Sequence, residues 1–278
     1  MRHINDFKTE FLQLYYEGKR DYEIADILGF TRTTVCYYRK HILGLPKNRA
    51  FQTLELTNSD REILVGTLMG DATLGKCSSD KTVRVQISHT KKNEEYLMWI
   101  KHSLPTLFIY NPYETIARDK IINGKSARSN GALVIYSCKA PCLDELYKVF
   151  YSGNKKIIPI DYLGKYFTAK SLAILFMDDG CKNCSTINLN LQCFELEELE
   201  KFVIFLKEKF NLEFIIKKDK TLYLRYNSRE TFYNLVIPFI TTDMLYKISG
   251  IVSSLNSVKR GNLLDNPVLN PQETVENA

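Results

Sequence analysis

The chain has 278 residues, 45% of them hydrophobic and 25% charged, a balance typical of a packed globular protein rather than a disordered one. Its longest apolar stretches fall short of the ~18 residues of a membrane span, and its first residues lack the apolar core of a signal peptide. The net charge is +6, and the seven cysteines, an odd number, favour reduced thiols inside a cell: in the cytoplasm, at the nucleoid or in an organellar matrix.

Residues 1–45 are predicted to form three short helices, within an N-terminal module at 1–50. In the segment DYEIADILGFTRTTVCYYRK (21–40), Ala25 stands where two helices touch, Gly29 takes the turn, and Val35 packs the second helix on the first. This pattern is typical of a helix-turn-helix, whose second helix enters the DNA major groove. The alternative is a small helical packing module. The exposed face of the second helix is expected to carry Arg32, Thr34, Arg39 and Lys40.

The rest of the chain reads as two similar runs of helices and strands, at 51–160 and 161–260, followed by a polar tail at 261–278 that is expected to be disordered. The first helix should begin near Asn58 or Ser59, with Glu62 completing a capping box. Alternation of apolar and polar residues predicts half-buried strands at 83–88 and 186–193. Further helices are expected at 93–104, 141–151, 170–180, 195–209 and 228–237, and further strands at 107–118, 131–138, 213–218 and 221–226.

Two apolar helices end in acids. The runs LVGTLMGDA (64–72) and LAILFMDDG (172–180) place Asp71 and Asp179 in the same register. A carboxylate is poorly placed at a helix C-terminus, which already carries partial negative charge. Two such helices packed side by side would increase the repulsion, and a divalent cation would remove it. The alternative is that both acids simply face water.

These two runs resemble the LAGLIDADG motif of homing endonucleases, and the segments GNKKIIP (153–159) and MLYKI (244–248) are also similar to that family. The resemblance covers about residues 55–250 and implies an α+β fold. Two pseudo-symmetric αββαββα halves would form a DNA-binding saddle, with the two motif helices at their interface. Two motifs in one chain imply a monomer that reads an asymmetric site. Ile174 and Asp178 stand where the motif places small residues, so the helices must pack differently here.

The resemblance implies Mg²⁺-dependent hydrolysis of both DNA strands, with short 3′ overhangs, and Mn²⁺ as a substitute. Asp71 and Asp179 would bind the metal, helped by the backbone carbonyls of Gly70 and Asp178. Because Asp178 lies beside Asp179, which acid binds stays open, although the register with Asp71 favours Asp179. The remaining catalytic candidates are a pair of lysines, one in each half, and a pair of glutamines that would hold water: Lys156, Lys247, Gln86 and Gln192.

The polar faces of the predicted strands carry side chains that suit base edges. Arginine pairs with guanine, and asparagine or glutamine with adenine. An ordinary solvated sheet face is the alternative. The residues expected to contact DNA in the body are Arg84, Ser88, Asn188, Asn190 and Arg225.

Site-specific cleavage of double-stranded DNA is therefore the predicted function. A non-cleaving DNA-binding regulator on the same scaffold is one alternative, although it predicts the loss of at least one acid, and both are present. An intron RNA maturase is another, and it would add intron RNA as a partner. A zinc site is disfavoured, because Cys181 and Cys184 have no second pair nearby to complete four ligands.

Overall fold

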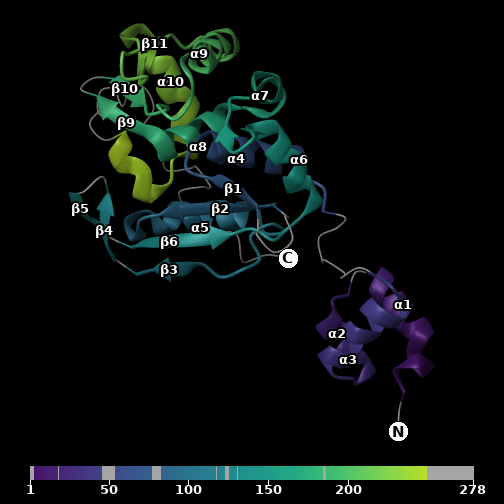
Figure 1. The fold of residues 1–278 in the computed structure, drawn as a ribbon. Coiled ribbons are helices and arrows are strands. Elements are labelled where there is room, and N and C mark those ends of the chain that lie inside the picture. Colours follow the sequence, from purple (N-terminus) through teal and green to yellow (C-terminus); the bar gives the residue numbers. More distant parts are fainter. Residues whose placement is uncertain are drawn as a thin grey trace, which may run out of the picture.

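The computed structural model describes residues 3–17, 19–45, 54–76, 83–116, 118–122, 125–129, 131–183 and 186–248. The buried hydrophobic residues form two separate clusters, one in the N-terminal helices and one in the body of the molecule. Figure 1 shows the N-terminal helices set apart from the body. The tail expected to be disordered, 261–278, lies outside the described residues.

The N-terminal module consists of short helices around a small core. A 3₁₀ turn (Ile4–Phe7) leads into α1 (Lys8–Tyr16), α2 (Asp21–Leu28) and α3 (Arg32–Tyr37), and α3 continues as one π-helical turn (Tyr38–Ile42). Ala25 and Val35 are buried in the core, as the sequence pattern predicts. Gly29 ends α2 in the left-handed conformation, which glycine adopts without steric cost.

One expectation for this module is wrong. Arg39 does not lie on the exposed face, because the residue is 4% exposed and its side chain forms two hydrogen bonds with the carboxylate of Asp21, at 2.7 and 3.1 Å. A third bond goes to the carbonyl oxygen of Leu45, at 2.7 Å. The π-helical turn directs the side chain inward, so Arg39 fastens the end of this helix to the start of α2. It is a structural residue, since breaking a buried ion pair leaves an uncompensated charge.

The first half of the body follows the order αββαββα, with an added hairpin. Its motif helix α4 (Asn58–Met69) begins with Thr57 as N-cap and Asp60 as its capping-box partner, slightly upstream of the start expected from the sequence. The other elements are β1 (Thr73–Lys76), β2 (Val83–His89), α5 (Glu94–Ser103), β3 (Tyr113–Thr115), the hairpin β4 (Arg118–Ile122) and β5 (Lys125–Ser129), β6 (Ala132–Tyr136) and α6 (Pro141–Phe150).

The second half repeats this order. A small hairpin, β7 (Tyr151–Ser152) and β8 (Lys155–Lys156), and helix α7 (Ile160–Tyr166) connect the two. The second half then consists of α8 (Ala169–Asp179), β9 (Gly180–Asn183), β10 (Thr186–Leu189), α9 (Leu196–Phe210), β11 (Phe214–Ile216), β12 (Leu222–Leu224) and α10 (Arg229–Val236), followed by 3₁₀ turns at Ile237–Phe239 and Thr242–Lys247.

The two sheets have the same topology. The first has the strand order β1-β2-β6-β3 and the second β9-β10-β12-β11, all antiparallel. Strands β1 and β9, which directly follow the motif helices, are too short and irregular in sequence to have been predicted from alternation. The α+β fold of two related halves is confirmed.

The motif helices α4 and α8 pack side by side between the halves (Figure 1). Glycines on α4 meet larger residues on α8. A Cβ atom on Gly66 would lie 2.8 Å from that of Ile174, and one on Gly70 would lie 2.5 Å from that of Asp178. The two bulky residues that depart from the motif are thus accommodated by the glycines opposite them, since distances this short leave no room for a side chain on both helices.

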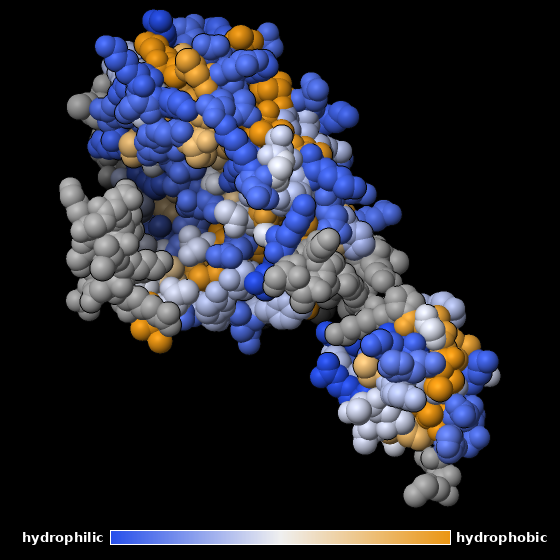
Figure 2. All heavy atoms as spheres, viewed as in Figure 1, coloured by the Kyte–Doolittle hydropathy of each residue, from blue (hydrophilic) through white to orange (hydrophobic). Residues whose placement is uncertain are grey.

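The body presents a hollow between its two halves. Figure 2 shows this surface lined largely by hydrophilic residues. In the part of the chain that the structure describes, no helix combines the length and apolar character needed to cross a membrane.

Candidate active site

Three carboxylates gather where α4 and α8 end. Asp71 follows the last turn of α4, and its side chain remains 41% exposed. Asp179 ends α8. Asp178, by contrast, crosses the helix interface: its fully buried side chain accepts a hydrogen bond from the backbone N–H of Asp71 at 3.2 Å. The neighbouring acids Asp178 and Asp179 therefore have different surroundings, and the side chain of Asp178 contacts residues of the first half.

The two predicted lysines occupy equivalent positions. Lys156, on β8, donates from Nζ to the carbonyl oxygens of Gly70 (2.8 Å) and Ala72 (2.9 Å). Lys247 donates to the carbonyl oxygens at the same positions of the second motif, those of Asp178 (3.2 Å) and Gly180 (2.9 Å). Each ammonium thus holds the backbone on both sides of one acid. The carbonyls expected to help bind metal face lysines here.

Burial and crowding shift the proton affinities of this cluster. Burial, with the nearby charges of Asp71 and Asp178, raises the pKa of Asp179 to about 7. Burial and the charge of Asp178 also raise the pKa of Asp71. Burial lowers the pKa of both Lys156 and Lys247. The ends of the two helices bring several carboxylate oxygens together and so concentrate negative charge. Oxygen ligands of this kind fit a divalent cation such as Mg²⁺.

A further buried group borders the acids on the first-half side. His89, at the end of β2, has a side chain that is 5% exposed and lies between two carboxylates, with Nδ1 3.6 Å from Asp71 Oδ2 and Nε2 3.5 Å from Asp178 Oδ1. Tyr96, on α5, donates its hydroxyl to Asp178 Oδ1 at 2.7 Å. Although burial alone would lower the pKa of His89, Asp178 and Asp71 raise it.

Neither His89 nor Tyr96 is among the site residues predicted from the sequence. One signal was present: His89 continues the buried side of β2, after Val83, Val85 and Ile87. A polar residue in an apolar register must find a partner inside the protein. Tyr96 lies in a helix with a mostly apolar face, and only the tertiary structure brings its hydroxyl to Asp178.

Strand register corrects the pairing of the two glutamines. Thr73 and Cys181 occupy equivalent positions, because each comes two residues after its motif acid, Asp71 or Asp179. Thr73 pairs with Gln86 across β1 and β2, and Cys181 pairs with Asn188 across β9 and β10. The counterpart of Gln86 is therefore Asn188. Gln192 lies in a turn after β10 and donates to Thr221 Oγ1 at 2.9 Å, so it is not the equivalent of Gln86.

The same register extends to the next strand. Gln86 pairs with Tyr136 on β6, and Asn188 pairs with Tyr223 on β12. A cation lies over each tyrosine ring: Arg84 is 3.9 Å from the centroid of Tyr136. Lys217 is 4.8 Å from the centroid of Tyr223. Each half therefore presents an amide, a tyrosine and a cation in matching positions on its polar sheet face.

The remaining candidates are dispersed over the surface. Ser88 and Asn190 are half-buried, Asn190 Nδ2 lies 3.7 Å from Cys181 Sγ, and Arg225 is exposed, 3.9 Å from Glu213. In the N-terminal module, Arg32 and Lys40 are exposed. Thr34 is half-buried, and its hydroxyl lies 2.9 Å from that of Thr31 at the start of α3.

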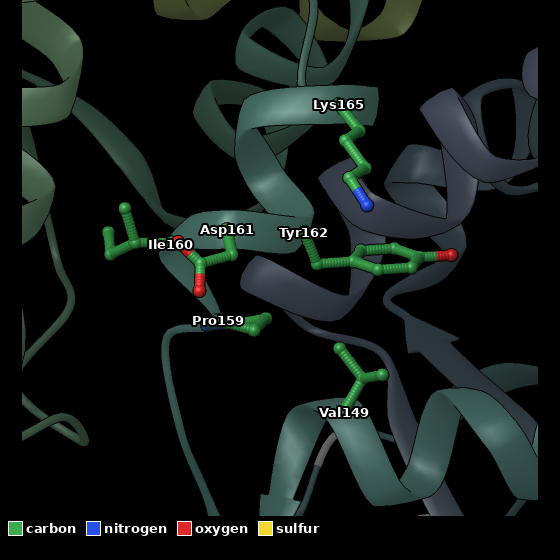
Figure 3. A pocket seen from close by; sticks show the side chains of 6 residues that line it. All are labelled: Val149, Pro159, Ile160, Asp161, Tyr162 and Lys165. Carbon is green, nitrogen blue, oxygen red and sulfur yellow. The ribbon is translucent and has the colours of Figure 1, made fainter.

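Two recesses lie elsewhere on the body. One, of about 290 Å³, lies between α6 and α7 and is lined by Val149, Pro159, Ile160, Asp161, Tyr162 and Lys165 (Figure 3). The other, of about 520 Å³, is lined by Leu54, Glu55, Leu56, Arg61, Pro141, Cys142 and Glu145. Neither is lined by a predicted site residue.

Comparisons with known proteins agree with this geometry. The model of the LAGLIDADG DNA endonuclease family matches residues 61–235. The chain is similar to a probable intron-encoded endonuclease 1 of Wickerhamomyces canadensis, at 31% identity over 76% of this chain and 95% of that protein. It is also similar to the cytochrome b mRNA maturase bI2 of Debaryomyces hansenii, at 23% identity over 78% of this chain and 81% of that protein.

Among solved structures, the chain is similar to the homing endonuclease I-WcaI bound to its DNA recognition sequence. The TM-score is 0.61 and the sequence identity 28%, over 76% of this chain and 97% of that one.

Proposed function

We propose, from the premise that this chain belongs to the LAGLIDADG DNA endonuclease family, that it is a homing endonuclease which binds one long asymmetric DNA site as a monomer and hydrolyses both strands with Mg²⁺. The observation that supports the catalytic assignment is the pair of equivalent helix ends, each with an acid and a lysine that binds the carbonyls on either side of it.

The acids would hold the metal. Asp71 and Asp179 offer oxygen donors in a crowded, partly buried cluster, and a bound divalent cation would supply Lewis-acid chemistry and a more acidic water. Mn²⁺, with similar preferences, should substitute. The buried side chain of Asp178 accepts the N–H of Asp71, and we assign it the role of holding that backbone in place.

The lysines would fix the geometry at each helix end. By binding the carbonyls around each acid, Lys156 and Lys247 hold the acids at fixed positions relative to the two scissile phosphates. Their positive charge also offsets the negative charge that develops on a phosphate under attack by water. Gln86 and Asn188 are half-buried and equivalent by register, because each pairs with the residue two positions after a motif acid. They are the candidates for orienting that water or a base.

The polar sheet faces would recognise the DNA. Arginine and amide side chains in the major groove distinguish base pairs, and stacking of cations on tyrosines fixes their direction. Arg84, Ser88, Asn188, Asn190 and Arg225 are the residues we assign to this surface. Because the halves differ in sequence, the recognised site should be asymmetric.

The N-terminal module would extend the footprint. Its exposed Arg32 and Lys40 suit phosphate contacts, with Thr34 at the start of the same helix. Arg32→Ala should weaken DNA binding and reduce the salt slope by about one counterion, with no loss of stability. Arg39→Ala should instead unfold the module, because Asp21 would remain buried without a partner. An unchanged salt slope in Arg32→Ala would remove this residue from the interface.

A maturase activity is the second candidate, because one relative is named as a maturase. Specific binding of an intron RNA would support it. For the compartment, we propose a reducing one that holds the target DNA, either the cytoplasm or an organellar matrix, since Cys36, Cys138, Cys142, Cys181 and Cys193 are free thiols.

The test of cleavage uses DNA that carries the insertion-free copy of the gene's own locus. Asp71→Asn and Asp179→Asn should each reduce cleavage more than a thousandfold while DNA binding persists, because each removes a metal-binding charge and keeps the side-chain shape. Asp161→Asn, at an exposed acid in the recess of Figure 3, is the matched control. Normal cleavage by both site variants would refute the catalytic assignment. No cleavage by the unaltered protein with Mg²⁺ or Mn²⁺ would favour the regulator.

A further inference from the structure

One cluster in the first half joins the motif acid Asp71 to His89, a buried residue that has no part in the proposed cleavage reaction. One donor atom from each of Asp71, His89 and Asp178 lies within 4.8 Å of the other two. The imidazole is almost completely buried, and its Nε2 has no hydrogen-bond partner among the described residues, although it points at Asp178. A buried polar atom without a partner is costly, so the site is expected to receive something that the protein itself does not supply.

The spacing of His89 Nε2 and Asp178 Oδ1 suits a shared ion better than a direct hydrogen bond. Their separation is 3.5 Å, and that of the other ring nitrogen, Nδ1, from Asp71 Oδ2 is 3.6 Å, both longer than N–H···O bonds. Two ligands that each lie about 2.0–2.2 Å from one ion are about 3.0–3.5 Å apart. Nε2 and Asp178 Oδ1 therefore stand at the spacing of co-ligands, with Asp71 at the rim.

The surroundings of Asp178 are those of a ligand held in place. Its Oδ1 accepts the hydroxyl of Tyr96 at 2.7 Å, and its Oδ2 accepts the N–H of Asp71 at 3.2 Å. A carboxylate has about four acceptor positions, so Oδ1 keeps one that is free to face Nε2. Partners that orient a ligating carboxylate in this way are typical of metal sites.

The second half lacks this cluster. By the register that equates Gln86 with Asn188, the counterpart of His89 is the buried Leu191. The position of Asp178 is taken by Gly70 in the other motif. The cluster therefore does not follow from the pseudo-twofold repeat, and it is not required by the packing of this fold, which accepts a leucine at the same place.

We propose that Asp71, His89 and Asp178 form a second divalent-cation site, present in the first half only, that takes a first-row transition ion such as Mn²⁺ or Zn²⁺. An imidazole nitrogen among the donors favours such ions over Mg²⁺, which prefers oxygen. The site shares Asp71 with the proposed cleavage centre, so its occupancy would affect one half of that centre and not the other.

The experiment uses Mn²⁺ as the ion and the full-length protein. Pulsed electron paramagnetic resonance of bound Mn²⁺ detects ¹⁴N of a coordinated imidazole. We expect this ¹⁴N modulation in the unaltered protein and in His102→Leu, a control at an exposed histidine of α5. It should be lost in His89→Leu, which installs the residue found at the equivalent position of the second half. Bound Mn²⁺ without ¹⁴N modulation, or modulation that persists in His89→Leu, would overturn the proposal.

Two further variants separate this site from the fold and from the cleavage reaction. Tyr96→Phe keeps the ring and removes only the hydroxyl that orients Asp178, so it should weaken Mn²⁺ binding at this site about 10- to 100-fold even if His89→Leu fails to fold. An unchanged Mn²⁺ affinity in Tyr96→Phe would count against the site. Asp179→Asn should abolish cleavage and keep the ¹⁴N modulation, so the failure of this proposal and the failure of the proposed function give different results.

Discussion

The two halves of the body share their sheet topology and differ in their buried polar groups. Lys156 and Lys247 bind carbonyls at matching motif positions, and Gln86 and Asn188 match by strand register. Beside Asp71, however, the first half buries His89, where the second half has Leu191. The halves therefore match at the acids and lysines that each DNA strand would need, and they differ in the side chains buried beside them.

The largest expected effect concerns the charge of Asp179. Its folded-state pKa of about 7 lies above its ordinary value of 3.8, so the metal-free folded protein binds more protons than the unfolded one between these pH values. The free energy of unfolding should therefore fall as pH rises from about 4 to about 7. The shift sets an upper limit of about 4 kcal/mol, and the actual decrease should be smaller because the side chain is partly solvated.

Urea denaturation of the metal-free protein across this pH range checks that prediction. Asp179→Asn should remove most of the decline and be more stable than the unaltered protein above pH 7, and Mg²⁺ should stabilise only the unaltered protein. A pH profile unaffected by this substitution would show that Asp179 is not crowded by its neighbours.

The lysines test whether the halves act separately. Lys156→Met and Lys247→Met should each slow cleavage of a different strand by roughly a hundredfold, because a cation near a phosphoryl transition state is commonly worth a few kcal/mol. Methionine retains most of the apolar stem. Labelling each strand separately would show nicked intermediates of opposite polarity. Equal slowing of both strands by either variant would mean that the lysines act in folding or binding.

The helix interface gives a smaller, structural test. Gly70→Ala should destabilise the body by roughly 1–3 kcal/mol, because its Cβ would lie 2.5 Å from that of Asp178. Gly75→Ala is the matched control in the neighbouring strand, where an added Cβ meets nothing within 4 Å. Thermal or urea denaturation measures both. Equal stability of the two variants would show that α4 and α8 are less tightly packed at this point.

The smallest effect is expected on the sheet faces. Gln86→Ala and Asn188→Ala should each weaken binding by about tenfold, with each variant losing discrimination in a different half of the target. Affinities for targets altered in one half or the other would show the pattern. Gln192→Ala should change affinity little, because its side chain bonds Thr221 instead. A large loss in Gln192→Ala together with none in Asn188→Ala would refute the register argument.

Much of the fold could be predicted because its signals are local. Apolar runs ending in acid mark α4 and α8, and alternation marks β2 and β10. The short strands β1 and β9 were not predicted, because four residues of mixed polarity show no clear alternation of apolar and polar side chains. The burial of Arg39 was not predicted for another reason. Its position in a regular helix indicated exposure, but the π-helical turn directs its side chain inward, where it binds Asp21.

The sequence by itself determined the repeat, the two acids in register and the lysine that follows in each half, because these depend on order and spacing along the chain. Only the tertiary structure decided that Asp178 crosses into the first half, that Gln86 matches Asn188 rather than Gln192, and that His89 and Tyr96 meet Asp178. Those relations join residues far apart in the chain, and their distances depend on how closely Gly66 and Gly70 let two helices approach.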